Sequence, residues 1–406
     1  MKRNLSHLFN NKGIPKGVKV FTLATSIRWF GWGFAETLIP IFLYSFSGTF
    51  AEAGLLRSTY DIGLILALPL IGIAADRVRA STLVLIGLFM YFFIGASYLL
   101  AGLTGMVMFI IIARFTNGIA YAFDSVGRSA YFRRHTPSEK VATVFGYFDT
   151  IANFWWIIAA LIGIVLIKYF SIATLLFLIT PTSIVAFLIV WKFRKKETEL
   201  IRPITNNKIG AAAAARKISG WSWALKSLVV LNFFISCAAT VVAFFLPIEV
   251  YTEGASLNMV VIFGVVATLP ALFGWQLGKW FDIKGTKSFV YGLVLFAVLL
   301  FSLPFFGGYI WKLVVAFLVG LIVEFLSVGN NELITVHANP EHFGQVDGVM
   351  RSISNIGSMV GPLAVGIAMD SFGIESSYIA LAVMLFILAI MFNFLNKYAF
   401  LKRRSV

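Results

Sequence analysis

Glu36, Asp61 and Arg114 are ionisable residues that stand inside long apolar stretches of the sequence. Ionisable side chains in such surroundings are costly, and they commonly mark the path of an ion or a solute. Burial disfavours the charged form of a carboxylate, whereas a nearby arginine favours it. Glu36 has no charged neighbour one helical turn away. An arginine that approaches and leaves Glu36 would make it take up and release a proton, so we predict Glu36 to be the main protonation site, with Arg114 as its partner.

Three more polar residues belong to the same predicted proton and substrate site. Asp61 lies four residues after Arg57, so an ion pair within one helix competes with a role in proton transfer. Asn117 follows Arg114 by three residues, and Glu324 stands in the middle of an apolar stretch in the second half of the chain. We therefore add Asp61, Asn117 and Glu324 to Glu36 and Arg114.

The elements that must position these residues are membrane-spanning helices. The chain has 406 residues, of which 59% are hydrophobic and 13% charged, whereas soluble domains are roughly 45–50% apolar and about 25% charged. A helix needs about 20 apolar residues to cross a bilayer, and unbroken apolar runs favour helices over the alternating strands of a barrel. We predict an all-α membrane protein with twelve transmembrane helices, at 18–46, 51–75, 81–101, 105–132, 140–167, 171–191, 222–250, 257–280, 287–307, 309–335, 343–370 and 375–397.

The net charge of +15 is explained by the position of the basic residues. With the amino terminus inside, the cytoplasmic segments hold 26 of the 33 lysines and arginines, and the external loops hold only Lys168 and Lys312. This asymmetry places both termini in the cytoplasm. We expect a multi-pass protein of a prokaryotic-type plasma (inner) membrane, with lipid and no nucleic acid as partners. Glu249 lies near an external helix end, where we expect it to be solvated.

The chain contains an internal repeat. An offset of 202 residues matches Gly118 to Gly320, and it also aligns Ser125-Val126-Gly127 with Ser327-Val328-Gly329. We infer two pseudo-symmetric six-helix bundles, residues 1–191 and 222–406, joined by a polar cytoplasmic linker over 192–221.

Four charged residues nearer the cytoplasm form a predicted inner gate: Arg28, Asp124, Asp149 and Arg351. Asp149 and Arg351 occupy corresponding positions in the two repeats. Opposite charges at one depth in the two halves would pair when the protein faces outward. Asp124 and Arg128 are four residues apart, so local pairing is an alternative.

Two short loops with glycine, aspartate and basic residues follow the second and eighth apolar runs. They read Gly72-x-x-x-Asp76-Arg77 and Gly278-x-x-x-Asp282-x-x-Gly285-x-Lys287. Together with the repeat, they resemble the signature loop of the major facilitator superfamily, although Arg79 replaces the usual glycine in the first copy. The resemblance implies that these loops switch conformation during transport.

A second motif refines this resemblance. Arg114, Asn117 and Gly118 are similar to the arginine motif of proton-coupled members, so the chain is closest in motifs to drug-efflux-like transporters. The resemblance implies a monomeric secondary transporter that binds a small-molecule substrate at mid-membrane and moves it by alternating access, with export of amphipathic compounds favoured. The glycine-proline motif of the antiporters is missing from "NFWWIIAALIGI", which keeps import of a sugar or organic acid by proton symport as the alternative.

Other kinds of site are not indicated by the sequence. No nucleophile motif and no phosphate-binding loop of the Walker type occur, so we expect neither an enzyme nor a cofactor. His135 and His337 precede helix-start signals, which explain them better than a metal site does. The tryptophans at 29, 32, 155 and 156 fit an aromatic-lined cavity and a lipid-facing surface equally well.

Overall fold

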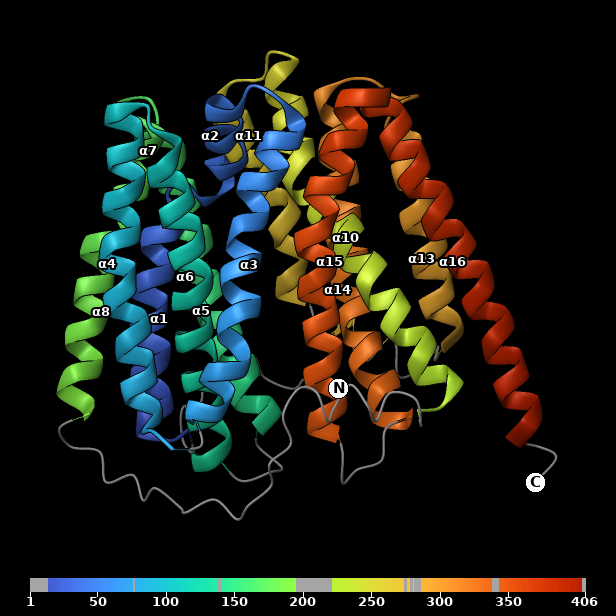
Figure 1. The fold of residues 1–406 in the computed structure, drawn as a ribbon, viewed down its shortest axis with the longest axis horizontal. Coiled ribbons are helices and arrows are strands. Elements are labelled where there is room, and N and C mark those ends of the chain that lie inside the picture. Colours follow the sequence, from blue (N-terminus) through green and yellow to red (C-terminus); the bar gives the residue numbers. More distant parts are fainter. Residues whose placement is uncertain are drawn as a thin grey trace, which may run out of the picture.

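The computed structural model describes residues 14–75, 77–136, 141–194, 221–273, 276–277, 280, 286–337 and 343–403. These residues form helices and turns, and no β-strand occurs among them (Figure 1). In the first half the helices are α1 (Lys16–Gly33), η2 (Glu36–Leu38), α2 (Ile39–Ser47), α3 (Phe50–Ala75), α4 (Ala80–Thr104), α5 (Val107–His135), α6 (Val141–Leu166), α7 (Ile172–Phe177) and α8 (Ile179–Arg194). In the second half they are α10 (Trp223–Thr252), α11 (Leu257–Thr268), η5 (Leu269–Phe273), α13 (Thr286–Ser302), α14 (Tyr309–His337), α15 (Phe343–Phe372) and α16 (Ile374–Arg403).

The predicted all-α membrane architecture is confirmed. Among the described residues, nine helices are long and apolar enough to cross a membrane, and two shorter apolar helices cover 257–273 and 287–302. The remaining predicted run, 18–46, is divided between α1 and α2. The number of segments that cross the membrane stays a prediction.

The division of the first run has a local cause. Proline lacks a backbone N–H and blocks the turn before it, and Pro40 stands at the start of α2. The short 3₁₀ turn η2, which begins at Glu36, fills the interval between α1 and α2. An acidic residue is therefore placed at a break in an otherwise apolar helical segment.

The internal repeat is visible in the helix boundaries. α5 and α14 are each 29 residues long, and they begin at Val107 and Tyr309 and end at His135 and His337. Both pairs of boundaries differ by 202 residues, which is the offset found in the sequence.

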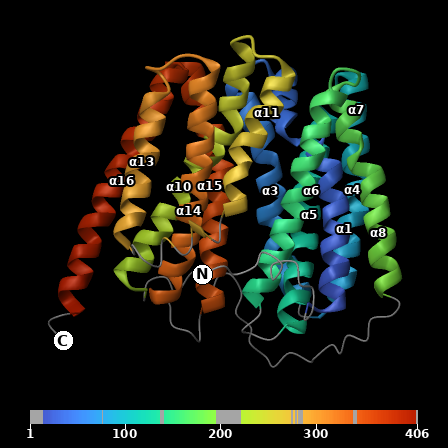
Figure 2. The same cartoon turned by 180° about the vertical axis from the view of Figure 1, so that it is seen from behind.

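The helices are arranged in two groups (Figures 1 and 2). Helices α1 to α8 pack on one another, and so do helices α10 to α16; we call these groups the amino and carboxyl halves. The halves meet where α3 contacts α15, α6 contacts α11 and α2 contacts α10. In both views their ribbons diverge toward the end at which α1 begins and α8 and α16 finish.

The contact between α3 and α15 closes the opposite end of the molecule. The Ser58 hydroxyl donates a hydrogen bond to the Met359 carbonyl at 2.5 Å. Gly54 packs directly against the carbonyl of Pro362, where any side chain would overlap that oxygen. We call this region, residues 50–58 of α3 with 359–370 of α15, the closed end.

One expectation about the outer surface was wrong. Lys312 is not in a loop but in the first turn of α14, where its side chain is 3% exposed. Its ammonium pairs with Glu249 at 2.7 Å and also with Glu253. Glu249 is therefore largely buried in an ion pair instead of being solvated, because the fold brings α14 against the end of α10.

Candidate functional site

A cavity of about 700 Å³ lies between the two halves. This volume is within the range that holds small organic ligands, roughly 300–1,000 Å³. All charged residues in its lining come from the amino half: Arg28, Glu36, Arg57 and Arg114. The carboxyl half contributes mainly apolar residues from α10, α11 and α14, such as Val242, Phe244, Phe263, Val319 and Val323. The cavity therefore has one charged wall and one apolar wall.

Glu36 is exposed to this cavity from the break between α1 and α2. Its Oε2 accepts a hydrogen bond from Nε1 of Trp156 on α6 at 2.5 Å. Glycines make this approach of α6 possible, because Gly33 packs on the Trp156 carbonyl and Gly163 packs on the Phe34 carbonyl. The carboxylate is thus held at the cavity wall by an indole from a neighbouring helix.

Arg57, Asp61 and Arg114 form a second group on α3 and α5. Nη1 of Arg57 pairs with Asp61 Oδ2 at 2.6 Å, which is the local ion pair that their spacing of four residues offered as an alternative. Nη2 of Arg114 donates a hydrogen bond to the Arg57 carbonyl at 3.2 Å. The ring of Tyr60 lies beneath both arginines, 5.5 Å from the Arg57 guanidinium and 5.0 Å from that of Arg114. Arg114 and Glu36 line the same cavity but are not ion-paired with each other.

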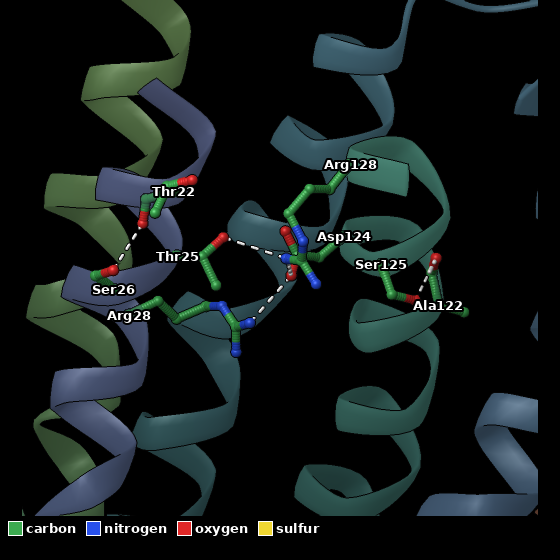
Figure 3. Close-up of polar contacts among 8 residues, drawn as sticks. All are labelled: Thr22, Thr25, Ser26, Arg28, Ala122, Asp124, Ser125 and Arg128. Atoms are coloured by element: carbon green, nitrogen blue, oxygen red, sulfur yellow. Dashed lines mark hydrogen bonds and ion pairs between the residues drawn. The ribbon is translucent and has the colours of Figure 1, made fainter. Parts of the chain in front are cut away.

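A third group is buried inside the amino half, between α1 and α5 (Figure 3). Asp124 Oδ2 accepts from Nη2 of Arg28 at 3.0 Å and from Nη1 of Arg128 at 2.5 Å. Arg128 also donates to the Thr25 hydroxyl at 3.2 Å. The Arg28 guanidinium lies 4.4 Å from the centre of the Tyr91 ring. This cluster joins α1 to α5 inside one half, so the pair Arg28 and Asp124 does not bridge the two halves.

The carboxyl half has a neutral cluster in the related position. Asn330 follows Arg128 by 202 residues, and its side-chain oxygen accepts from the Asn232 amide at 2.8 Å. Ser354 donates a longer hydrogen bond to Asn232 at 3.4 Å. The repeat therefore keeps a polar contact at this position, with an arginine in the amino half and an asparagine in the carboxyl half.

The other predicted gate residues lie away from the closed end. Asp149 on α6 and Arg351 on α15 are both exposed, and they are not paired with each other. Glu324 on α14 is half-buried beside Val323 of the cavity lining and within electrostatic reach of Asp149. Asn117 is buried and lines the cavity.

The predicted switch loops are described only in part. Gly72 lies in the last turns of α3 with open space around it. Arg77 follows the end of α3, and Lys287 lies at the start of α13; both side chains are exposed. Asp76, Gly278, Asp282 and Gly285 lie outside the described residues, as does most of the linker over 192–221.

A bundle of apolar helices that encloses a partly charged cavity between two halves defines a membrane transport protein. The family model of the Major Facilitator Superfamily matches residues 21–357 and 287–405. The chain belongs to this superfamily.

Relatives agree with this membership. An MFS-type transporter of Methanocaldococcus jannaschii is 22% identical over 382 residues, which cover 90% of this chain and 94% of that protein. The nucleoside transporter NupG superposes with a TM-score of 0.74 at 14% identity, covering 95% of this chain and 100% of that one. A bacterial homologue of the human lysosomal transporter Spinster superposes with a TM-score of 0.75 at 15% identity, covering 95% and 97%. At these identities the superpositions show the shared fold.

Proposed function

We propose that this member of the superfamily is a proton-coupled secondary transporter that moves a small organic solute by alternating access. The solute binds in the cavity between the halves, and Glu36 is the residue that takes up and releases the proton. The observation that carries the proposal is the placement of Glu36, a carboxylate at a helix break, exposed to the cavity and held by Trp156 at 2.5 Å. Discontinuous helices commonly form the solute and ion sites of secondary transporters.

The contacts between the halves support the alternating-access part of the proposal. Between described residues, the hydrogen bonds that join the halves all lie at the closed end. The sequence predicts that both termini are cytoplasmic. The end at which α1 begins and α16 finishes then faces the cytoplasm, and the closed end faces outward. Asp149 and Arg351, exposed and not paired with each other, are then the open inner gate, and they would meet when the cavity turns outward.

The direction of transport is proposed from the motifs. The arginine motif at Arg114 favours a drug-efflux-like protein that exports amphipathic compounds. Import of a sugar or organic acid by proton symport is the second candidate, because α6 lacks the glycine-proline motif of the antiporters. An imposed pH gradient distinguishes the two: solute that accumulates in proteoliposomes on the side to which protons flow indicates symport, and solute that moves against the proton flow indicates antiport.

The proton coupling is tested in proteoliposomes with a solute found by thermal-shift screening, since a true ligand stabilises the folded form that it binds. Solute-driven proton movement is measured for the native protein, for Glu36→Gln and for Glu52→Gln. Glu52 is an exposed acid in the first turn of α3, so its variant is a matched control. We expect coupling to be lost only in Glu36→Gln. Unchanged coupling in that variant would remove Glu36 from the mechanism.

A further inference from the structure

The three arginines of the cavity differ in how their charge is balanced. Arg28 pairs with Asp124, and Arg57 pairs with Asp61. Arg114 forms no ion pair with any carboxylate among the described residues. It is nevertheless 5% exposed and lines the cavity. A buried guanidinium that lacks an anionic partner is energetically costly, so a bound anion would stabilise Arg114.

The immediate surroundings of Arg114 leave hydrogen-bonding capacity unused. Its Nη2 donates to a backbone carbonyl of Arg57, and its Nε has no acceptor. Tyr60 supports one face of the guanidinium and supplies no full negative charge. The planar group is thus fixed in position and retains donors for a ligand, which is the geometry that carboxylates and phosphates bind in pairs.

Other hydrogen-bond donors in the cavity lining also have unused hydrogen-bonding capacity. Nε1 of Trp32, the hydroxyl of Thr37 and Nε of Arg28 are buried without a hydrogen-bond partner. The amino end of α2, where Ile39 and Pro40 line the cavity, adds the positive end of a helix dipole. These unpartnered donors and the helix end suit a solute group that accepts hydrogen bonds.

Glu36 is the one carboxylate among the described residues that line the cavity. When Glu36 is ionised it offsets the charge of Arg114 through space. When Glu36 is protonated, the other carboxylate within electrostatic reach of Arg114 is Asp61, which is already ion-paired with Arg57. The solute and Glu36 therefore compete to neutralise the same arginine.

We infer that the solute is an organic anion whose carboxylate or phosphonate-like group binds Arg114, with an apolar part packed between aromatic residues such as Trp32, Tyr60 and Trp156. This inference rests on the proposed function, because it assumes that the cavity is the transport site. It names the substrate class by charge and leaves the direction of transport open.

The test measures binding to the purified full-length protein in detergent. The probes are matched sets on phenyl, indole and hexyl scaffolds, each bearing a carboxylate, a phosphonate, a primary amide or an ammonium group. Binding is read as a rise in unfolding temperature and as a Kd from calorimetric titration. We expect at least one carboxylate or phosphonate to stabilise the protein, and its amide and ammonium counterparts to have little effect.

Three variants assign the binding to Arg114. Arg114→Gln should weaken binding of the anion by roughly tenfold or more, because a charged hydrogen-bond partner is lost. Arg133→Gln removes an exposed arginine from the same helix and should change nothing. Glu36→Gln should bind the anion several-fold more tightly, since the competing charge is gone. This last variant keeps the test valid if Arg114→Gln does not fold.

The inference is overturned if no anion stabilises the protein, if an amide or ammonium probe does so equally well, or if the anion Kd is the same in Arg114→Gln. Weaker anion binding in Glu36→Gln would also overturn it. The two proposals fail separately. Anion binding through Arg114 without proton movement refutes only the proposed proton coupling. Proton-coupled transport of an ammonium solute refutes only the inference that the solute is an anion.

Discussion

Asp370 of α15 caps the amino end of α3 from the other half of the molecule. Its Oδ1 accepts a hydrogen bond from the Phe50 backbone N–H at 3.0 Å, and its Oδ2 accepts from that of Ala51 at 2.8 Å. The first N–H groups of a helix have no partner within the helix, and the Thr49 hydroxyl serves only that of Glu52. A carboxylate is also favoured at this positive end of the helix dipole. The cap of α3 is therefore complete only while the closed end is closed.

Asp370→Ala should favour the state in which the closed end is open. Loss of a capping side chain costs about 1 kcal/mol, and this cost falls on the closed state alone. We expect the open population to rise about fivefold. The measurement is labelling of Ala243→Cys, an exposed cavity position on α10, by an impermeant maleimide added on the side of the closed end.

The native cysteine supplies the control for this experiment. Cys237 is buried, so protein without the introduced cysteine should label slowly whether or not Asp370 is replaced. Equal labelling of Ala243→Cys with and without the Asp370→Ala substitution would show that the cap does not hold the end closed.

Gly54→Ala should prevent full closure of the same end. The added Cβ would overlap the Pro362 carbonyl, so α3 and α15 must separate. We expect faster labelling at Ala243→Cys from the closed-end side and a lower transport rate.

Gly348→Ala on the partner helix α15 is the matched control. Nothing lies within contact of a Cβ at this position, and alanine is more stable than glycine inside a helix by about 0.5–1 kcal/mol. Its labelling and transport should match those of the native protein. A similar loss of transport in both variants would mean that α3 and α15 tolerate no added side chain, and the overlap at Gly54 would not explain the loss.

The sequence was sufficient for the features that depend on neighbours along the chain. Apolar runs predicted the helices because helix length is set by the membrane. The spacing of four residues indicated the ion pairs Arg57 to Asp61 and Asp124 to Arg128 as alternatives to the site and gate roles, because such positions share one helix face, and both pairs are present. The second partner of Asp124 is Arg28, 96 residues away, and only the packing of α1 on α5 reveals it.

Two features of the structure show what the sequence analysis missed. Asp370 binds backbone N–H groups about 320 residues away, and backbone donors carry no signature in the sequence. Trp155 and Trp156 are neighbours in an apolar helix, yet Trp155 is 44% exposed and Trp156 is 8% exposed. Most of α6 is apolar, so the indoles themselves gave no choice between the two faces. The available signal was Asn153, which lies three residues before Trp156 on the same face and also lines the cavity.

Asp124→Asn should destabilise the amino half. The substitution keeps the shape of the side chain but leaves two buried guanidinium groups, those of Arg28 and Arg128, without a carboxylate. Removing one member of a buried ion pair costs about 3–5 kcal/mol. We expect a marked fall in the unfolding temperature in detergent.

Asp149→Asn is the control for this prediction. Asp149 is exposed, and substitutions at such positions change stability by about 0.5 kcal/mol or less. If both variants melted at the same temperature, the cluster around Asp124 would be shown to contribute no net stability.

Trp156→Phe should slow proton-coupled transport while leaving the protein folded. Phenylalanine keeps an aromatic ring on α6 but lacks the N–H that Trp156 donates to Glu36. A functional group is effective when its neighbours fix its position, and hydrogen bonds to charged groups contribute about 1.5–3 kcal/mol. We expect the rate of solute-driven proton movement to fall about tenfold.

Trp155→Phe is the control for this prediction. It changes the adjacent indole, which packs on Phe30 and Phe154 and does not line the cavity. Its rate should equal that of the native protein. Equal rates in the two variants would mean that the indole contributes only apolar contact, and Glu36 would have to be held in place by other means.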